Sequence, residues 1–292
     1  MAAPALHPID RLSAVLGHFP VQAQWLLSGP LCAGAQVTAR PEQGFLQLLR
    51  HGQLTLTQGQ ARRAVQRREL HTPTLLLYLP APGPSWRSLP SADADITCAT
   101  LHFVAGANHP LVRALPPLLA IPLQAVPGLD GALALLFAEA EQLRCGHRLL
   151  ADRLCEVVLI QLLRWLLDHP EQGGVSVGLV AGLADAALAR ALTAVHAQPG
   201  ADWDVRRMAQ QAGLSRSAFA ARFKRLVGLS PADYLRDWRM RLAMQQLAQG
   251  QSVKCIADAL GYANPSALSR VFAQRLGMPP RAWLATAHSA RA

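Results

Sequence analysis

The chain has 292 residues, 51% of them hydrophobic and 16% charged, which is enough apolar material for two folded domains and excludes a disordered protein. The formal net charge of +10 is unevenly spread: residues 1–199 carry 14 Lys and Arg against 13 Asp and Glu, whereas residues 200–292 carry 14 against 5. A domain with so concentrated a positive charge attracts polyanions, nucleic acid before anionic membrane.

The cysteines and the apolar runs indicate the compartment. Five cysteines are widely spaced, with no C-x-x-C pair, so neither a disulfide framework nor a zinc clip is predicted. The first twenty residues contain no basic segment before an apolar core, and Arg, Asp or Gln interrupt the apolar runs before they could span a bilayer. We expect a soluble, cytoplasmic protein without a membrane partner.

Residues from about 20 to 127 have the pattern of an antiparallel sheet. QLTLTQ alternates apolar and polar residues, and TLLLYLP and DITCATLHFV are short runs typical of buried strands. Turns are predicted at Gly44, Gly52, Gly59 and PAPGPS. This part is predicted to be a small antiparallel barrel or sandwich.

Two helices are predicted over residues 129–170, with a break near Cys145 and Gly146 and an end before Pro170. The second of them is rich in Leu, Val and Ile, so this segment is either domain core or a dimerisation surface. The Gly-rich stretch EQGGVSVG has no periodicity and indicates a linker, assigned to residues 171–184. Everything after it is predicted to be helical.

The last third contains a repeat. Residues around Ser215–Pro231 recur at an offset of 49, and the helix before them recurs at an offset of 48. The matched pairs include Ser217 and Ser266, Phe223 and Phe272, Gly228 and Gly277, Pro231 and Pro280, and Gly213 and Gly261. Each copy has a helix (Val205–Ala212 or Val253–Leu260), a turn with Gly, and a second helix (Ser215–Leu226 or Ser266–Leu276), the order of a helix-turn-helix.

The second helix of each copy is amphipathic in a way that suits DNA. Phe219 and Phe223 are one turn apart and anchor the buried face, while the other face carries small residues flanked by Arg and Lys. Small residues let a helix backbone approach base edges in the major groove. Pro231–Gln249 forms the connecting helix, about 28 Å long, close to the roughly 34 Å between successive major-groove faces. A solenoid fragment or a protein-binding adaptor is the alternative for a repeated helix pair.

At these residues the sequence resembles the AraC/XylS family of bacterial transcription regulators. WDVRRMAQQAGLSRSAFAARFKRLVGLSPADYL and SVKCIADALGYANPSALSRVFAQRLGMPP follow the family's two frameworks over roughly Asp185–Leu284. Two departures stand out: Leu268 replaces an aromatic residue, and Leu284 follows Trp283 where the family often has Arg. The resemblance implies double-stranded promoter DNA and RNA polymerase as partners, and a sequence-specific regulator that is either an activator or a repressor.

The resemblance also implies which residues meet DNA. The base-facing positions are Ser217, Ala218, Ala220 and Ala221 in the first copy, and Pro265, Ser266, Ser269 and Arg270 in the second. Arg216, Lys224 and Arg225 are expected at phosphates. Of these side chains only Arg270 suits a bidentate contact to guanine, whereas the Ala-rich first helix suits methyl contacts and shape recognition.

GFLQLLRHGQLTL, TLLLYLP, ITCATLHF and NHPLVRALPPLL resemble the cupin-type domain found in one branch of the family. The predicted fold is therefore α+β: a cupin-like antiparallel β-barrel with helices, then an all-α domain with two helix-turn-helix units joined by a long helix. The predicted domains are a sensory barrel over 1–128, a helical segment over 129–170 that is a candidate for homodimerisation, a linker over 171–184 and a DNA-binding domain over 185–292.

Three features of the predicted barrel domain are candidates for receiving the signal. The hairpin ARRAVQRRE, with Arg62, Arg63, Arg67 and Arg68, is either a solvated edge or an anion site. Cys98 is a candidate redox residue where this cupin branch often has Cys, although a strand Cys is more commonly inert packing. The third feature is the apolar barrel interior, which could hold a small apolar or aromatic molecule.

The rival function is a metal-dependent cupin enzyme fused to a helical accessory domain. The sequence has no H-x-H with a following Glu, and His51 and His102 are more typical of wall residues than of metal ligands. We expect no catalytic residues, no metal and no cofactor.

Overall fold

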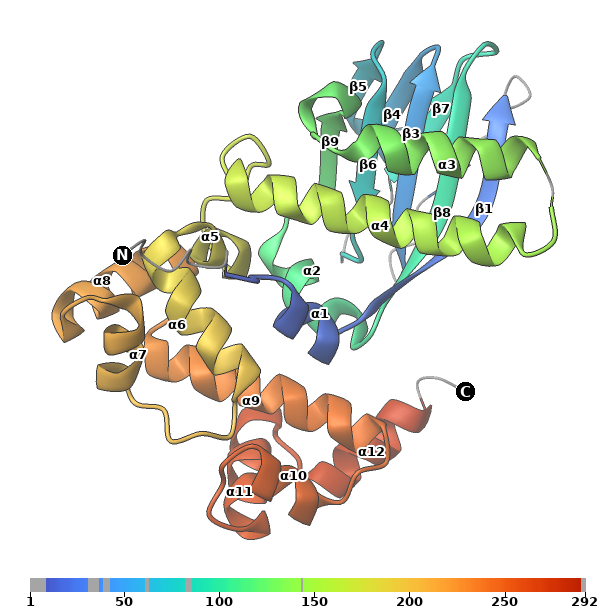
Figure 1. Ribbon diagram of the computed structural model, residues 1–292. Coiled ribbons are helices and arrows are strands. Elements are labelled where there is room, and N and C mark those ends of the chain that lie inside the picture. The colour runs from blue at the N-terminus through green and yellow to red at the C-terminus, as the bar shows by residue number, and fades with distance from the viewer. Residues whose placement is uncertain are drawn as a thin grey trace. The chain divides into compact units, whose positions relative to one another are not determined.

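The computed structural model describes residues 9–30, 37–38, 43–60, 63–81, 86–142 and 144–289 (Figure 1). The predicted α+β class is confirmed, with strands in the first part of the chain and helices in the rest. The chain forms two compact units. We call Phe19–Val180 the barrel unit, and the residues up to His18 together with those from Ala181 onward the helical unit.

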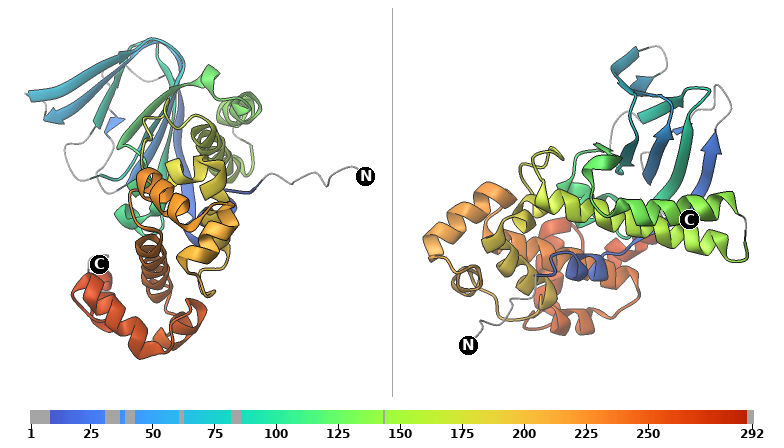
Figure 2. Two further views of the ribbon diagram at one scale, coloured as in Figure 1. Left: turned by 90° about the vertical axis from the view of Figure 1, so that its left-hand side faces the viewer. Right: turned by 45° about the horizontal axis from the view of Figure 1, so that its top comes forward.

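The barrel unit contains two antiparallel sheets. Its strands are β1 (Val21–Pro30), β2 (Val37–Thr38), β3 (Gly44–His51), β4 (Leu54–Gln60), β5 (Arg63–Leu70), β6 (Thr74–Tyr78), β7 (Trp86–Pro90), β8 (Asp95–Phe103) and β9 (Leu118–Pro122). One sheet has the order β1-β8-β3-β6-β9 and the other β2-β7-β4-β5. The β4–β5 hairpin projects beyond the rest of the unit (Figure 2).

The five-stranded sheet is covered on both faces, which explains why its strands are continuous apolar runs. Residues 44–49 of β3 and all of β6 are buried. Alternate side chains such as Phe45 and Leu49 join a cluster with Leu54 and Leu56 of the other sheet. Leu46 and Leu48 of β3 face the opposite way, toward helices α3 (Leu129–Glu141) and α4 (His147–Asp168), which lie across this sheet in Figure 1.

Helix α4 also protects the edge strand β1. The Asp152 carboxylate accepts the Trp25 backbone N–H at 2.6 Å, and the Glu156 carboxylate accepts the Ala23 N–H at 3.3 Å. These bonds satisfy donors that an edge strand would otherwise leave free for another chain. The predicted break between the two helices lies at Gly146, which adopts the left-handed conformation before α4.

Turns separate α4 from the helices that follow it, which include the repeat. After α4, residues 170–178 form turns and bends, and α5 (Leu179–Ala184) begins inside the segment expected to be a linker. The other helices of the chain are α1 (Ser13–His18), α2 (Pro110–Ala114) in the barrel unit, α6 (Ala186–Ala197), α7 (Val205–Ala212), α8 (Arg216–Val227), α9 (Pro231–Ala248), α10 (Val253–Ala259), α11 (Pro265–Leu276) and α12 (Pro280–Ser289).

Helix α1 belongs to the helical unit, although the strands of the barrel unit come directly after it in the chain. Val15 is completely buried there. The Gln245 amide of α9 donates to the His18 carbonyl, and His18 Nε2 donates to the His196 carbonyl of α6 at 3.0 Å. The structure therefore divides the chain differently from the expected barrel domain over 1–128, because residues 9–18 belong to the helical unit. No helix in the described part of the chain combines the length and the apolar content needed to span a membrane.

Candidate nucleic-acid interface

Two copies of the helix-turn-helix lie on either side of helix α9, and both second helices have the same length. Helix α8 begins and ends 49 residues before α11, as the repeat predicts. The first helices, α7 and α10, begin 48 residues apart. The helix-turn-helix prediction is confirmed, with boundaries within one residue of those expected for all four helices.

Capping residues place these boundaries. Ser215 and Asn264 accept the backbone N–H groups of Ala218 and Ala267, at 3.3 and 2.8 Å, and so begin α8 and α11. Gly213 ends α7 with φ +68°, a left-handed conformation that costs glycine little. The turns thus present the N-terminal half of each second helix at the surface.

The buried face of each second helix is anchored in the same way. Phe219 and Phe223 of α8, and Leu268 and Phe272 of α11, are at most 1% exposed. Leu268 therefore fills the position where the family has an aromatic residue, without opening the core. The Trp283 ring of α12 packs edge-on against Phe272 with centroids 5.8 Å apart.

All the residues predicted to meet DNA lie at the surface. The exposed ones are Arg216, Ser217, Ala218, Ala221, Lys224, Arg225, Ser266 and Arg270, and the half-buried ones are Ala220, Pro265 and Ser269. The helical repeat places Ser217, Ala221 and Lys224 on one ridge of α8, and Ser266 and Arg270 on the matching ridge of α11. Each copy brings its predicted set together on one face.

The basic residues of the helical unit fall into two classes. Arg190, Arg222, Arg239 and Arg241 are bonded to carboxylates or backbone carbonyls of the same unit. By contrast, Arg216, Lys224, Arg225 and Arg270 form no ion pair with any described residue. Cations without an internal partner are free to meet phosphates or bases.

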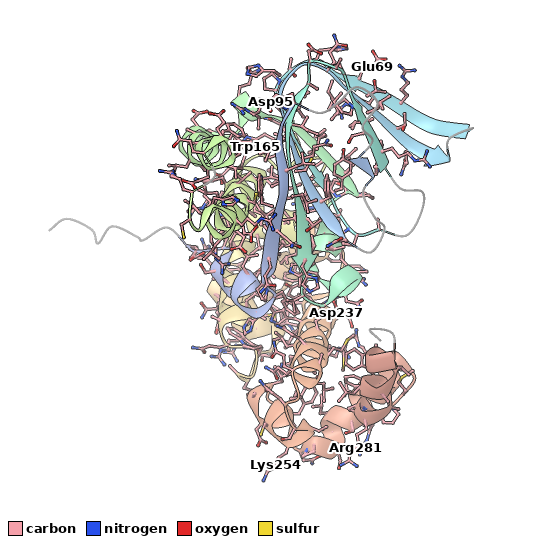
Figure 3. The ribbon with its side chains drawn as sticks, turned by 90° about the vertical axis from the view of Figure 1, so that its right-hand side faces the viewer. Glu69, Asp95, Trp165, Asp237, Lys254 and Arg281 are labelled. Carbon is pink, nitrogen blue, oxygen red and sulfur yellow. The ribbon has the colours of Figure 1, made fainter. Side chains whose placement is uncertain are left out.

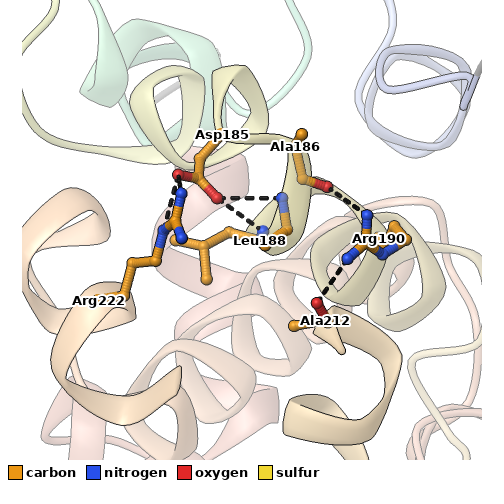
Figure 4. Close-up of polar contacts among 7 residues, drawn as sticks. Asp185, Ala186, Leu188, Arg190, Ala212 and Arg222 are labelled. Atoms are coloured by element: carbon orange, nitrogen blue, oxygen red, sulfur yellow. Dashed lines mark hydrogen bonds and ion pairs between the residues drawn. The ribbon is translucent and has the colours of Figure 1, made fainter. Parts of the chain in front are cut away.

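Two arginines of the bonded class, Arg190 and Arg222, attach the first helix-turn-helix copy to α6, as Figure 4 shows. Asp185 caps α6 by accepting the N–H groups of Ala187 and Leu188 at 3.1 and 3.0 Å. Its other oxygen accepts two bonds from Arg222 of α8 at 2.8 and 2.5 Å. Arg190 donates to the Ala212 carbonyl at the end of α7, at 2.6 Å, so one short helix holds both helices of the copy.

Among the described exposed cations of the helical unit that were not predicted as site residues, Arg236 and Arg275 are paired with carboxylates, whereas Arg206, Lys254 and Arg281 are not. The latter three have no ion pair with a described residue, and Figure 3 shows Lys254 and Arg281 on the outside of the helical unit. Their charge was visible in the sequence, but no motif singled them out.

The candidate redox residue Cys98 is buried on β8. Burial raises the pKa of the Cys98 thiol to about 12, with a further contribution from neighbouring Cys155. The reactive thiolate is therefore scarce near neutral pH. Among the described cysteines, Cys145 and Cys255 are the exposed ones.

The remaining candidates of the barrel unit are separate from one another. His51 and His102 are exposed, and their places on β3 and β8 put them near opposite ends of the sheet, because Asp95 pairs with His51 and lies seven residues, about 24 Å, from His102. No group of three or more His, Cys, Asp or Glu residues in the described ranges is arranged to hold a metal ion. Arg67 is paired with Glu69 at 2.8 Å, Arg68 is exposed, and Arg62 and the Arg63 side chain lie outside the described residues.

Comparison with known proteins accounts for both units. Residues 10–168, more than half of the chain, match the family described as Cupin, and residues 208–286 match the family described as Helix-turn-helix domain. An AraC-like transcription regulator of Streptomyces lividans is 38% identical over 181 residues, which are 61% of this chain and 59% of that protein. The HTH-type transcriptional regulator AlkR of Acinetobacter baylyi is 31% identical over 179 residues, 60% of this chain and 58% of AlkR. The matches thus span less than two thirds of these two relatives.

Solved structures show a partial likeness. The DNA-binding domain of AdpA, solved with a target DNA, is 30% identical and covers 37% of this chain and 96% of its own, with a TM-score of 0.33. ToxT from Vibrio cholerae is 12% identical and covers 91% of this chain and 98% of its own, with a TM-score of 0.39. Since both scores are low, no geometry is carried over from either structure. On the family matches and the relatives, the chain belongs to the AraC/XylS family, as a member whose helix-turn-helix domain follows a cupin domain.

Proposed function

We propose that this protein is a sequence-specific transcription regulator that inserts α8 and α11 into successive major grooves of promoter DNA. The observation that carries the proposal is the matched exposed ridge on both second helices, which begins with small residues and includes a cation, Lys224 in α8 and Arg270 in α11. Helix α9 separates the two copies, and its 18 residues span about 27 Å, which is near the spacing of successive major grooves.

The two second helices contribute differently to recognition. Arg270 of α11 occupies the position of Ala221 in α8, so only the second copy offers a guanidinium to the edge of a guanine. The exposed cations of α8 stand at other positions, Arg216 at the first residue of the helix and Lys224 and Arg225 later in it, and we assign all three to phosphates. We assign base readout mainly to α11, and methyl and shape contacts to α8.

The barrel unit is proposed to receive the signal, a small molecule or an oxidant, and to change how the two second helices are presented. A response through Cys98 would require that thiol to become exposed first, because its pKa is about 12 in this structure. Contact with RNA polymerase is part of the proposal, and reconstituted transcription on a bound promoter would test it.

The test is a binding measurement with matched variants. A duplex selected by the full chain from a randomised pool serves as specific DNA, and a scrambled duplex as non-specific DNA. Arg270→Ala should weaken specific binding by about 1 to 3 kcal/mol and leave non-specific binding nearly unchanged. Lys224→Ala removes the same charge and should weaken both, while lowering the salt slope by about 1.

Ala221→Ser is the control at the corresponding position of the first copy and should change affinity little. Equal, negligible losses in the Arg270 and Ala221 variants would show that α11 does not read bases. Binding that does not depend on salt between about 50 and 200 mM would contradict DNA recognition as a whole.

A further inference from the structure

Three segments of the helical unit meet at one point between the two helix-turn-helix copies. They are the 198–204 loop just before α7, the α10–α11 turn around Gly261, and Arg239 of α9. We call the contact among Gly200, Gly261 and Arg239 the junction. None of these residues is on a DNA-facing ridge.

The first component of the junction is a pair of hydrogen bonds from Arg239 to the 198–204 loop. Its Nε donates to the Pro199 carbonyl at 2.7 Å, and its Nη2 donates to the Ala201 carbonyl at 2.8 Å. The guanidinium thus bridges the carbonyls on both sides of Gly200. The side chain is half-buried, and burial lowers the pKa of Arg239 because desolvation disfavours the charged form.

The second component is direct contact of backbone with backbone. A Cβ atom on Gly200 would lie 3.0 Å from the Ala259 carbonyl carbon and closer still to its oxygen. A Cβ on Gly261 would meet Gly200 in the same way and would lie 3.3 Å from Arg239 Nη2. Only glycine at both positions lets the loop and the turn approach this closely.

The 198–204 loop is hydrogen-bonded within itself and to α7, so a constraint on the loop acts on α7 as well. The Trp203 indole donates to the Gln198 carbonyl at 2.7 Å, and Arg207 of α7 donates to the Asp202 carbonyl at 2.9 Å. Asp204 at the end of the loop caps α7. On the other side, the α10–α11 turn leads directly into α11, whose position it determines.

From this arrangement we infer that the junction sets the angle between the two helix-turn-helix copies, and with it the distance between the two DNA half-sites that the protein accepts. The inference rests on the proposed function, since it concerns how α8 and α11 bind one DNA duplex together. Each base pair added between half-sites rotates the second by about 34° around the duplex, so a rigid junction penalises a shift of even one base pair.

The experiment compares spacing variants of the selected duplex, with the spacer lengthened or shortened by one and two base pairs, alongside duplexes that retain a single half-site. The unaltered protein should lose about tenfold or more in affinity for a one-base-pair change. Arg239→Gln should bind the optimal duplex about tenfold more weakly and bind all spacings almost equally, while its affinity for each single half-site stays unchanged. Arg236→Gln is the control, because it removes an exposed Arg from the same helix.

Each result decides the inference. If Arg239→Gln keeps the spacing preference of the unaltered protein, or if that protein has none, the junction does not set half-site distance. Should Arg239→Gln fail to fold, Arg239→Lys keeps the charge but lacks the planar guanidinium whose Nε and Nη2 each bond one carbonyl, and the same change in spacing preference is expected. Failure of the unaltered protein to bind any DNA would instead overturn the proposed function.

Discussion

His196 is a fully buried imidazole at the centre of the helical unit. Its Nε2 lies 2.6 Å from the Tyr234 hydroxyl, and its ring lies against Trp238 with centroids 4.1 Å apart. Burial lowers the pKa of His196 to about 3, with a smaller contribution from His18. The folded protein therefore holds this imidazole neutral at a pH where the unfolded chain would protonate it.

This residue predicts how stability depends on pH. Because the folded pKa is below the unfolded value of 6.5, the stabilisation is present above pH 6.5 and is lost as the pH falls toward the folded pKa of about 3. Between about pH 7 and pH 5 the helical unit should lose about 2 kcal/mol through this group. Urea unfolding of His196→Gln measures it: the variant should be less stable at pH 7 and show a flatter pH profile. Parallel profiles for the two proteins would contradict the assignment.

The sequence alone predicts some of the site residues but not others. Arg270 and Ala221 could be found because the repeat aligns them and helical spacing fixes the exposed face. The role of Arg239 could not be predicted, because its partners are the backbone carbonyls of Pro199 and Ala201. Every residue type has a backbone carbonyl, so no sequence pattern identifies such partners. The role of Gly200 depends on a contact with the turn after α10, which only the fold brings about.

Helix α1, which is six residues long, packs with helices that are far from it in the sequence. Val15 within it and Leu12 just before it are buried, and its last residue is bonded to α6 and α9. We predict that Val15→Asp releases α1 and destabilises the helical unit by about 2 to 4 kcal/mol, because a carboxylate replaces a buried apolar side chain. Hydrogen exchange of the full chain should speed up in α6 and α9 and stay unchanged in β3 and β6.

Ser13→Asp is the control for this prediction, since Ser13 is exposed on the same helix. Unchanged exchange in α6 and α9 of the Val15 variant would show that α1 contributes nothing to the helical unit. The sequence could not predict this docking, because the short apolar pattern of α1 does not specify partners more than 170 residues away. The recognition helices were predictable for the opposite reason: their caps, glycines and anchors are local and occur twice.

For the whole molecule, we propose that the homodimer for which residues 129–170 are the candidate segment forms through apolar side chains exposed on α3 and α4. Leu135 is 59% exposed on α3, and Leu149, Leu150 and Val157 are 64%, 45% and 41% exposed on α4. Leu150 and Val157 are seven residues apart, so they lie on one stripe of α4. A second copy of this chain that covers the stripe would bury them, and two copies would present four recognition helices to one promoter.

Sedimentation of the full chain tests this proposal. The unaltered protein should be a dimer at micromolar concentration, and Val157→Glu should make it a monomer, because a charge would be buried in the contact. Leu89→Glu is the control, since Leu89 is similarly exposed but lies on β7. If the unaltered protein is a monomer, the proposed dimer does not form. If the Val157 variant remains dimeric, the contact does not involve this stripe of α4.

The placement of α1 has a consequence for how the protein is made. The barrel unit is a continuous stretch, Phe19–Val180, and can fold while the ribosome is still translating the helices from Ala181 onward. Helix α1 is translated before the barrel unit, whereas its partners α6 and α9 are translated after it. While the barrel unit is being made, Leu12 and Val15 have neither of these helices to cover them, so the nascent chain carries an exposed apolar segment that chaperones are suited to shield. The helical unit can therefore be completed only after α9 has been translated, when the whole barrel unit already exists.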